Sequence, residues 1–184
     1  MLTLCLLRHA KSSWSDGSLD DHARPLNKRG RADAPRMGEF IAAHSLSPDL
    51  IVCSTASRTR ETLALVEPQL AKARHKVRFD DAIYEVPPSR LIEYIRRLPD
   101  GSRTALVIGH NPGMQGAALD LTGQGDIALI KKLALKFPTG TLAVLTFECN
   151  TWAGVRPGKG QLEMFVRPKD LDGATSVLRP EDED

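Results

Sequence analysis

The segment LLRHAKSSW, residues 6–14, places a cation and an imidazole, Arg8 and His9, directly after an apolar run. That run, residues 2–7, is typical of a short buried strand of a parallel sheet. A neutral imidazole nitrogen is a competent nucleophile toward phosphorus, and a guanidinium offers forked donors that match phosphoryl oxygens. The pair therefore predicts phosphoryl chemistry at the end of the first strand.

Two later segments offer the same residue types after further buried strands. The segment STASRTRET, residues 54–62, follows an apolar run and places Arg58 in the first turn of a predicted helix. The strand TALVIGH, residues 104–110, ends in His110 and leads into the helix start NPG. In an open α/β sheet, ligands bind outside the carboxyl ends of the strands, and helix N-termini there favour anions. We therefore expect these segments to meet the first pair at one anion-binding edge.

The four side chains together predict a phosphoryl transfer without a metal ion. The phosphoryl group would move in line onto His9 and then be hydrolysed by water, while a protonated His110 stabilises charge on the equatorial oxygens. The cluster lacks the carboxylate-rich surroundings of a magnesium site, and His22, His44 and His75 lack metal-ligand spacing. We therefore expect no metal and no cofactor.

Strand and helix patterns alternate along the chain, which favours an α/β fold. We expect a three-layer sandwich with a mostly parallel central sheet flanked by helices. The expected strands are residues 2–7, 49–54, 104–110, 141–149 and 161–168, with a less regular strand and turn at 76–85 and a hairpin of the last two strands. We expect four helices. The first begins at Lys28 after an Asn27 cap and contains Pro35, and the second spans 57–73 with a break near Pro68. The third spans 89–98, and the fourth follows the NPG at 111–113.

The chain of 184 residues, 41% of them hydrophobic, is suited to one domain. We expect that domain over residues 1–168, followed by a charged C-terminal tail, residues 169–184, that is partly disordered. The tail ends in RPEDED, which is too polar to pack against a core.

Composition excludes several partner classes. The formal net charge of +2 and an aromatic content of 5% argue against nucleic acid. The apolar runs are far shorter than the roughly 18 residues of a membrane span, and no signal peptide is recognised. Three cysteines, each in an apolar run, indicate free buried thiols in a reducing compartment. We expect a cytoplasmic monomer that binds neither nucleic acid nor membrane.

The three segments resemble the signature blocks of the histidine phosphatase superfamily, also called phosphoglycerate mutase-like. LLRHAKSS is similar to the block with an Arg-His-Gly core, with Ala10 in place of the glycine, and VIGHNPG is similar to the third block. CSTASRTRETL is similar to the second block, through Ser54, Arg58, Glu61 and Thr62. The resemblance implies that His9 accepts the phosphoryl group and that Arg8, Arg58 and His110 bind the phosphate.

The short chain and the run DDHARPLNKRG resemble the SixA branch, which acts on phosphohistidine in signalling proteins. This resemblance implies a phosphorylated partner such as a histidine phosphotransfer domain, and it directs Arg24 toward the pocket as a further phosphate-binding residue. The chain has no room for the insertions that form a lid over sugar phosphates in larger relatives. Trp14 is a candidate for the mouth of the pocket.

The general acid of the larger relatives has no obvious counterpart. Glu85 is the nearest candidate, and Asp16, Asp20 and Asp21 are more distant ones. An alkoxide leaving group needs a proton donor, commonly worth about 10²–10⁴-fold in rate, whereas an imidazole leaves more easily. A missing acid would therefore favour a P–N substrate.

Two alternatives remain at this point. One is a small-molecule phosphomonoesterase with a deep, selective pocket. The other is a binding module that recognises phosphorylated partners without turnover. The intact set of four candidate side chains favours an enzyme over the binding module.

Overall fold

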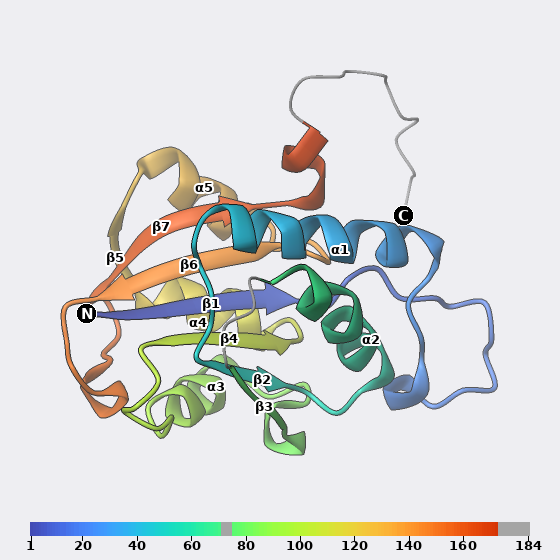
Figure 1. Cartoon of the computed structure of the whole chain (residues 1–184), viewed down its shortest axis with the longest axis horizontal. Coiled ribbons are helices and arrows are strands. Elements are labelled where there is room, and N and C mark those ends of the chain that lie inside the picture. Colours follow the sequence, from blue (N-terminus) through green and yellow to red (C-terminus); the bar gives the residue numbers. More distant parts are fainter. Residues whose placement is uncertain (71–74, 173–184) are drawn as a thin grey trace.

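The computed structural model describes residues 1–70 and 75–172. Within them, the strands are β1 (Leu2–Arg8), β2 (Leu50–Cys53), β3 (Lys76–Phe79), β4 (Thr104–Gly109), β5 (Thr122–Gly125), β6 (Leu142–Phe147) and β7 (Gly160–Val166). They form a seven-stranded sheet in the order β3-β2-β4-β1-β6-β7-β5. The sheet places β1 at its centre, next to β4 (Figure 1).

The sheet is mostly parallel. Strand β1 pairs parallel with β4, β4 with β2, β2 with β3, and β5 with β7. The antiparallel pairs are β1 with β6 and β6 with β7. The expected hairpin of the last two strands is thus confirmed, as is the mostly parallel sheet.

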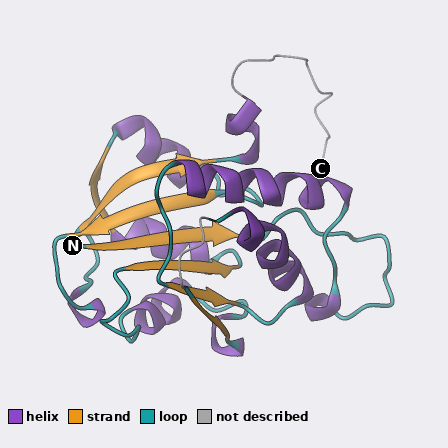
Figure 2. Ribbon diagram, viewed as in Figure 1, coloured by secondary structure: helices purple, strands orange, loops and turns teal. Residues whose placement is uncertain are grey.

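Helices cover both faces of the sheet, as expected for three layers (Figure 2). They are α1 (Lys28–Ala43), α2 (Ser57–Val66), α3 (Pro88–Ile95), α4 (Gly113–Leu121) and α5 (Ile127–Leu135). Buried residues of α1 and α2 form one apolar cluster with the sheet, and buried residues of α3, α4 and α5 form the other. Figure 1 shows α1 and α2 in front of the sheet, with α3 and α4 behind it.

Strand β1 is apolar because both of its faces are covered. Side chains alternate across a strand, so Leu4 and Leu6 join the α3–α4 cluster, whereas Cys5 and Leu7 join the cluster with α1 and α2. A strand buried on both faces holds its end firmly. Arg8, its last residue, is therefore delivered from a rigid element.

Some helix bounds differ from the sequence-based expectation. Helix α2 ends at Val66 and continues as a 3-10 turn, η2 (Glu67–Gln69), which contains Pro68. The expected break near this proline is confirmed, and the remaining expected helical residues, 71–73, lie outside the described residues. Helix α1 begins after Asn27, whose side chain accepts a hydrogen bond from the backbone amide of Gly30 at 2.9 Å.

Two elements were not anticipated. Strand β5 has the sequence TGQG, which has no apolar residue to mark it, and it forms because β7 offers a parallel edge. Helix α5 follows at once, capped by the Asp126 side chain. Its backbone leads into Phe137, which lies close to the site described below.

The beginning of the expected tail is structured. A 3-10 helix, η5 (Pro168–Asp172), packs near α1, and Arg36 forms an ion pair with Asp172 at 2.5 Å. Residues 173–184 lie outside the described residues, so the domain and tail division stays a prediction. No described helix combines the length and the apolarity needed to span a bilayer.

Candidate active site

The strand register brings the two candidate catalytic histidines together. Arg8 at the end of β1 pairs with Gly109 at the end of β4, so His9 and His110 leave the sheet side by side. The backbone amide of His9 donates to the carbonyl of Gly109 at 3.1 Å. The centroids of the two imidazole rings lie 5.3 Å apart. The expected meeting of these distant segments is therefore present in the structure.

The hydrogen bond of His9 assigns its tautomer. Its Nδ1 lies 2.7 Å from the carbonyl oxygen of Ala10, which can only accept, so Nδ1 carries the proton and Nε2 holds the lone pair in the neutral ring. Burial lowers the pKa of His9 to about 3, and the nearby charges of His110, Arg8 and Arg58 act in the same direction, against the hydrogen bond to Ala10. The ring is therefore neutral at physiological pH, as a nucleophile must be.

Helix α2 and helix α1 hold the segment that follows the nucleophile. The amide of Ala10 donates to Thr62 Oγ1 at 3.0 Å, and that hydroxyl donates to the carbonyl of Arg58 at 2.6 Å. On the other side, a side chain at Gly30 would collide with the backbone carbonyl of Lys11. The glycine one turn into α1 thus lets the helix approach the loop closely.

His110 is buried beside the nucleophile and is neutral. Its Nε2 lies 2.8 Å from Ser54 Oγ, and burial, followed by the charge of Arg58, lowers its pKa to about 3. Burial disfavours the charged ring in the ligand-free site, whereas the expected protonation of His110 concerns the site during phosphoryl transfer and stays a prediction. A bound phosphoryl dianion would raise this pKa, since an opposite charge favours the cation.

Two buried nitrogens near the rings have no hydrogen-bond partner in the part of the chain that the structure describes. Nδ1 of His110 and Nε of Arg8 are buried and have no hydrogen-bond partner among the described residues. Arg8 is fixed by its NH1 group, which donates to the carbonyl of Phe137 at 2.8 Å. Because buried polar groups are nearly always paired, these two nitrogens mark a place for a ligand, and the Nε–H of Arg8 can only donate to it.

Arg58 is almost completely buried, with 2% of its surface exposed, and reaches the site from the first turn of α2. Its NH1 donates to the backbone carbonyl of Asp21 at 2.6 Å, and its NH2 contacts Asp21 Oδ2 at 2.9 Å and Glu85 Oε1 at 3.0 Å. In this state, two carboxylates occupy NH2 of the guanidinium and a backbone carbonyl occupies NH1. An incoming phosphoryl group would have to compete with them.

Asp21 connects the cationic residues of the site. It begins the 3-10 helix η1 (Asp21–Ala23); Oδ1 accepts from Arg24 NH1 at 2.5 Å and Oδ2 accepts from the Tyr84 hydroxyl at 2.7 Å. Partial burial raises the pKa of Asp21, but the hydrogen bonds from Tyr84, Arg24 and Arg58 outweigh it and hold that pKa well below its usual range. Asp21 is therefore a carboxylate at all physiological pH values.

The four candidate acids, Glu85, Asp16, Asp20 and Asp21, have different surroundings in the structure. Glu85, with a half-exposed side chain and a backbone φ of 47°, reaches Arg58, and Asp21 does so as well. Asp16 and Asp20 do not line the cavity. Two aspartates adjacent in sequence, Asp20 and Asp21, thus differ completely in surroundings, which only the fold of η1 decides.

Arg24 does point into the pocket. Besides Asp21, its guanidinium contacts Ser12 Oγ at 2.7 Å and the Ser13 carbonyl at 3.1 Å. Its Cζ lies 3.1 Å from the centroid of the Trp14 ring, which is 75% exposed. Trp14 therefore lies at the mouth of the cavity, as expected.

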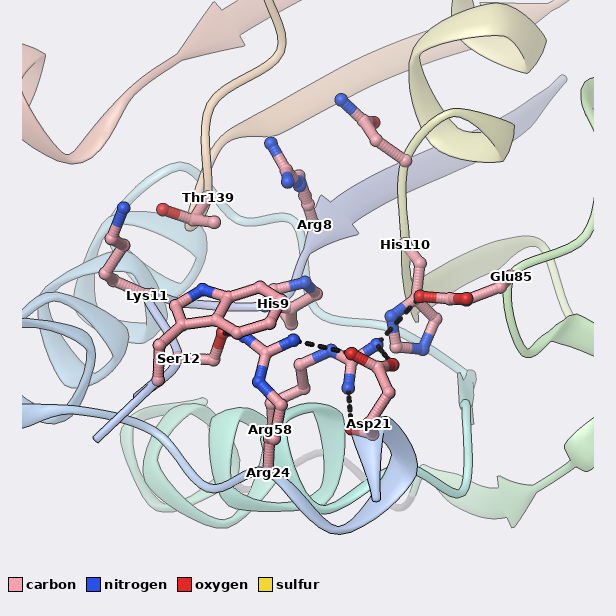
Figure 3. Close-up of a pocket in the computed structure, with 12 residues that line it drawn as sticks. Arg8, His9, Lys11, Ser12, Asp21, Arg24, Arg58, Glu85, His110 and Thr139 are labelled. Carbon is pink, nitrogen blue, oxygen red and sulfur yellow. Dashed lines mark hydrogen bonds and ion pairs between the residues drawn. The ribbon is translucent and has the colours of Figure 1, made fainter. Parts of the chain in front are cut away.

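These side chains surround one cavity of about 250 Å³ (Figure 3). It lies at the carboxyl ends of β1, β2 and β4, in agreement with the expected position. Figure 3 shows Asp21 and Glu85 approaching Arg58, next to His110. The lining residues are Arg8, His9, Lys11, Ser12, Trp14, Asp21, Arg24, Arg58, Glu85, His110, Asn111 and Thr139.

Sequence reasoning missed several members of the site. Lys11, Ser12, Asn111 and Thr139 are neighbours of the recognised segments or of the turn after α5, and their residue types carry no distinctive signal. Tyr84 could have been suspected from its position next to Glu85.

The remaining histidines lie apart from the catalytic pair. His75 contacts Glu67, and His44 stacks on Phe40 with ring centroids 3.9 Å apart. His22 lies closer, with Nε2 2.9 Å from Thr55 Oγ1. Over residues 1–70 and 75–172, no group of three or more His, Cys, Asp or Glu side chains is placed to hold a metal ion.

Comparison with known proteins agrees with this geometry. The sequence model of the histidine phosphatase superfamily, branch 1, matches residues 4–87, a segment that includes His9, Arg58 and Glu85 but not His110. An uncharacterized protein of Mycobacterium tuberculosis is 38% identical over 165 residues, which cover 89% of this chain and 100% of that protein. The chain belongs to the histidine phosphatase superfamily.

Similarity to solved structures indicates the branch of the superfamily. A candidate phosphohistidine phosphatase SixA from Nakamurella multipartitia matches with a TM-score of 0.78 and 29% identity, over 91% of this chain and 96% of that one. A second candidate phosphohistidine phosphatase SixA, from Agrobacterium tumefaciens, matches with a TM-score of 0.76 and 27% identity, over 91% and 98% of the two chains. The protein is thus a SixA-like member of the superfamily and a phosphatase, with the phosphoglycerate mutase-like fold expected for it.

Proposed function

We propose that the protein is a metal-independent phosphatase that removes the phosphoryl group from phosphohistidine in signalling or phosphotransfer proteins, through a phosphorylated His9. The observation that carries this proposal is the Nδ1–H of His9 bound to the Ala10 carbonyl, which leaves Nε2 with the lone pair inside a cavity lined by arginines. A buried neutral imidazole needs no general base to become nucleophilic.

The first step forms a bond between His9 Nε2 and phosphorus and breaks the bond between phosphorus and the substrate nitrogen. The electron pair of the broken bond stays on the substrate imidazole. If the substrate ring is protonated at its other nitrogen, it leaves as a neutral imidazole with one N–H. His9 keeps its own N–H at Nδ1, so no proton has to move. Arg8, Arg58 and His110 would bind the phosphoryl oxygens.

The second step returns the enzyme to its starting state. A water oxygen forms a bond to phosphorus, the bond to His9 Nε2 breaks, and its electron pair returns to the ring. The two water protons leave with dihydrogen phosphate. The Ala10 carbonyl keeps Nδ1 protonated throughout, so the ring is released in the tautomer from which it started.

An ester substrate would need more from the site. An alkoxide must receive a proton as it leaves, and Glu85, which approaches Arg58 at 3.0 Å, is the side chain that we propose for this role. A small-molecule phosphomonoesterase therefore stays the second candidate function. The observation that favours it is the position of the Glu85 carboxylate in the cavity wall, 3.0 Å from Arg58 NH2.

The size of the cavity supports the protein substrate. Small-molecule sites usually enclose roughly 300–1,000 Å³ and bury most of the ligand. This cavity holds about 250 Å³, and Trp14 at its mouth is 75% exposed. A phosphorylated imidazole presented by another protein fits such a site better than a sugar phosphate does. The names of the two SixA neighbours support the same substrate class.

The test uses a histidine phosphotransfer domain phosphorylated with ³²P. Wild type is expected to release inorganic phosphate and to form an acid-labile phosphoenzyme, whereas His9→Ala should form none and lose at least about 10³-fold in kcat/KM. His44→Ala, at a surface histidine on the end of α1, is the matched control and should behave as wild type. Undiminished hydrolysis by His9→Ala would reject the mechanism.

Three further expectations stay predictions. They are a cytoplasmic location, a monomeric state, and the lack of nucleic-acid or membrane partners. Gel filtration with light scattering at micromolar concentration measures the second of them directly.

A further inference from the structure

Asp21 places a negative charge within the cavity that is meant to receive an anion. Its Oδ2 accepts from Arg58 NH2 at 2.9 Å, and its Oδ1 accepts from Arg24 NH1 at 2.5 Å (Figure 3). Both arginines also line the cavity beside His9. The carboxylate therefore occupies donors that a phosphoryl group would use.

The carboxylate is held in place from several sides. The backbone carbonyl of Asp21 accepts from Arg58 NH1 at 2.6 Å, and the Tyr84 hydroxyl donates to Oδ2 at 2.7 Å. The next residue, His22, contacts Thr55 at the start of the α2 segment and lies against the Tyr84 ring, with centroids 4.9 Å apart. Asp21 is thus a fixed part of the cavity wall rather than a side chain that is free to turn away.

Glu85 differs from Asp21 in this respect. Among the described residues its carboxylate has one partner, Arg58 NH2 at 3.0 Å, although the two side chains are similarly exposed, 48% for Glu85 and 42% for Asp21. With this single partner it can turn away from the guanidinium when a ligand enters. Asp21 has three side-chain partners, so its charge stays beside the phosphoryl site.

Two classes of substrate differ in the charge that they carry next to the phosphoryl group. A phosphate monoester near neutral pH carries up to two negative charges on the phosphoryl group and none elsewhere near it. A phosphorylated imidazole can add a positive charge on its ring when the second nitrogen is protonated. A fixed carboxylate repels the phosphoryl oxygens of both classes, but it also attracts the protonated ring of the second, which offsets part of that repulsion.

We propose that Asp21 is a specificity-determining residue: its carboxylate competes with the phosphoryl oxygens of every substrate for Arg58 and Arg24 but attracts a protonated imidazole ring, and so favours phosphorylated imidazole over phosphate monoesters. This inference rests on the proposed function and adds how the site selects the P–N bond. The cost is weaker binding of any phosphoryl dianion, including the product.

The test compares two small substrates, p-nitrophenyl phosphate and N-phosphoimidazole, in Asp21→Asn. The amide keeps the shape and an acceptor for Tyr84 and removes the charge. The ratio of kcat/KM for the ester to kcat/KM for the P–N compound should rise about tenfold, and the inhibition constant of inorganic phosphate should fall by a similar factor. Asp20→Asn, one residue earlier and exposed, is the control and should leave both values unchanged.

An equal gain or an equal loss on both substrates would overturn the proposal, because a residue that only positions the arginines would affect both alike. Phosphate that binds no more tightly to Asp21→Asn than to wild type would overturn it as well. Asp21→Ser provides the same comparison should the amide variant fail to fold. Absence of phosphoenzyme in wild type would reject the proposed function instead, so the two failures are distinguishable.

Discussion

The amide of Ala10 donates to the hydroxyl of Thr62 at 3.0 Å, and this bond ties the residue after His9 to the helix that carries Arg58. Thr62 donates in turn to the carbonyl of Arg58 at 2.6 Å. One buried hydroxyl therefore sets the position of the loop that carries His9 relative to the helix that carries Arg58.

Thr62→Val should lower both stability and turnover. The substitution preserves volume but leaves the Ala10 amide without its partner, which costs about 1–3 kcal/mol of unfolding free energy. We also expect kcat to fall by about tenfold or more, because His9 loses its fixed geometry. Urea denaturation and steady-state assays on N-phosphoimidazole measure the two effects; full turnover in a destabilised variant would contradict the positioning role.

Thr141→Val, at a second buried threonine, should have the opposite effect on stability. Its Oγ1 is buried without a hydrogen-bond partner among the described residues. Replacing a desolvated, unpaired hydroxyl by a methyl group should raise the free energy of unfolding by up to about 1 kcal/mol. The midpoint of urea unfolding checks this, and a drop in stability would show that the hydroxyl has a partner in solution.

The pH dependence follows from the two lowered histidine pKa values. Both His9 and His110 have a pKa of about 3, so the ligand-free enzyme keeps both rings neutral from pH 8 down to pH 5. In ¹⁵N NMR spectra, their ring nitrogens should show no titration around pH 6.5. A midpoint close to 6.5 for His9 would contradict the assignment of a buried neutral nucleophile.

Stability should respond to the same two groups. Between pH 6.5 and pH 3 the unfolded chain binds protons at these histidines that the folded protein does not, so the free energy of unfolding falls as pH falls through this window. His9→Ala should flatten that decline, because one of the two groups is removed. An equally steep decline in the variant would indicate that other groups cause it.

Glu85→Gln should discriminate between leaving groups. An alkyl phosphate needs a proton donor, so its kcat/KM should fall by about 10²–10⁴-fold, whereas phosphohistidine hydrolysis should change little. The direction is opposite to that expected for Asp21→Asn, in which the ester gains relative to the P–N substrate. Equal loss on both substrates would assign Glu85 to the binding of the phosphoryl group.

Chelation should leave the activity intact. We expect dialysis against EDTA to change kcat/KM on phosphohistidine by less than about twofold, since His9 and the arginines would perform the chemistry without a metal ion. Added Mg²⁺ or Zn²⁺ should not raise the rate of the dialysed enzyme. Loss of activity that a metal restores would contradict the proposed mechanism.

The sequence by itself determined the class of fold and the core of the site. Apolar runs ending in Arg8-His9 and in His110, with Arg58 at a helix start, required no knowledge of distant contacts, because strand ends in a parallel sheet share one edge. Tertiary structure alone decided which of several similar residues belong there. Asp20 and Asp21 are identical in type, yet only Asp21 meets Arg24, Arg58 and Tyr84, through the turn of η1. The protonation of the two imidazoles was likewise decided by burial, a property of the packed chain that local sequence does not contain.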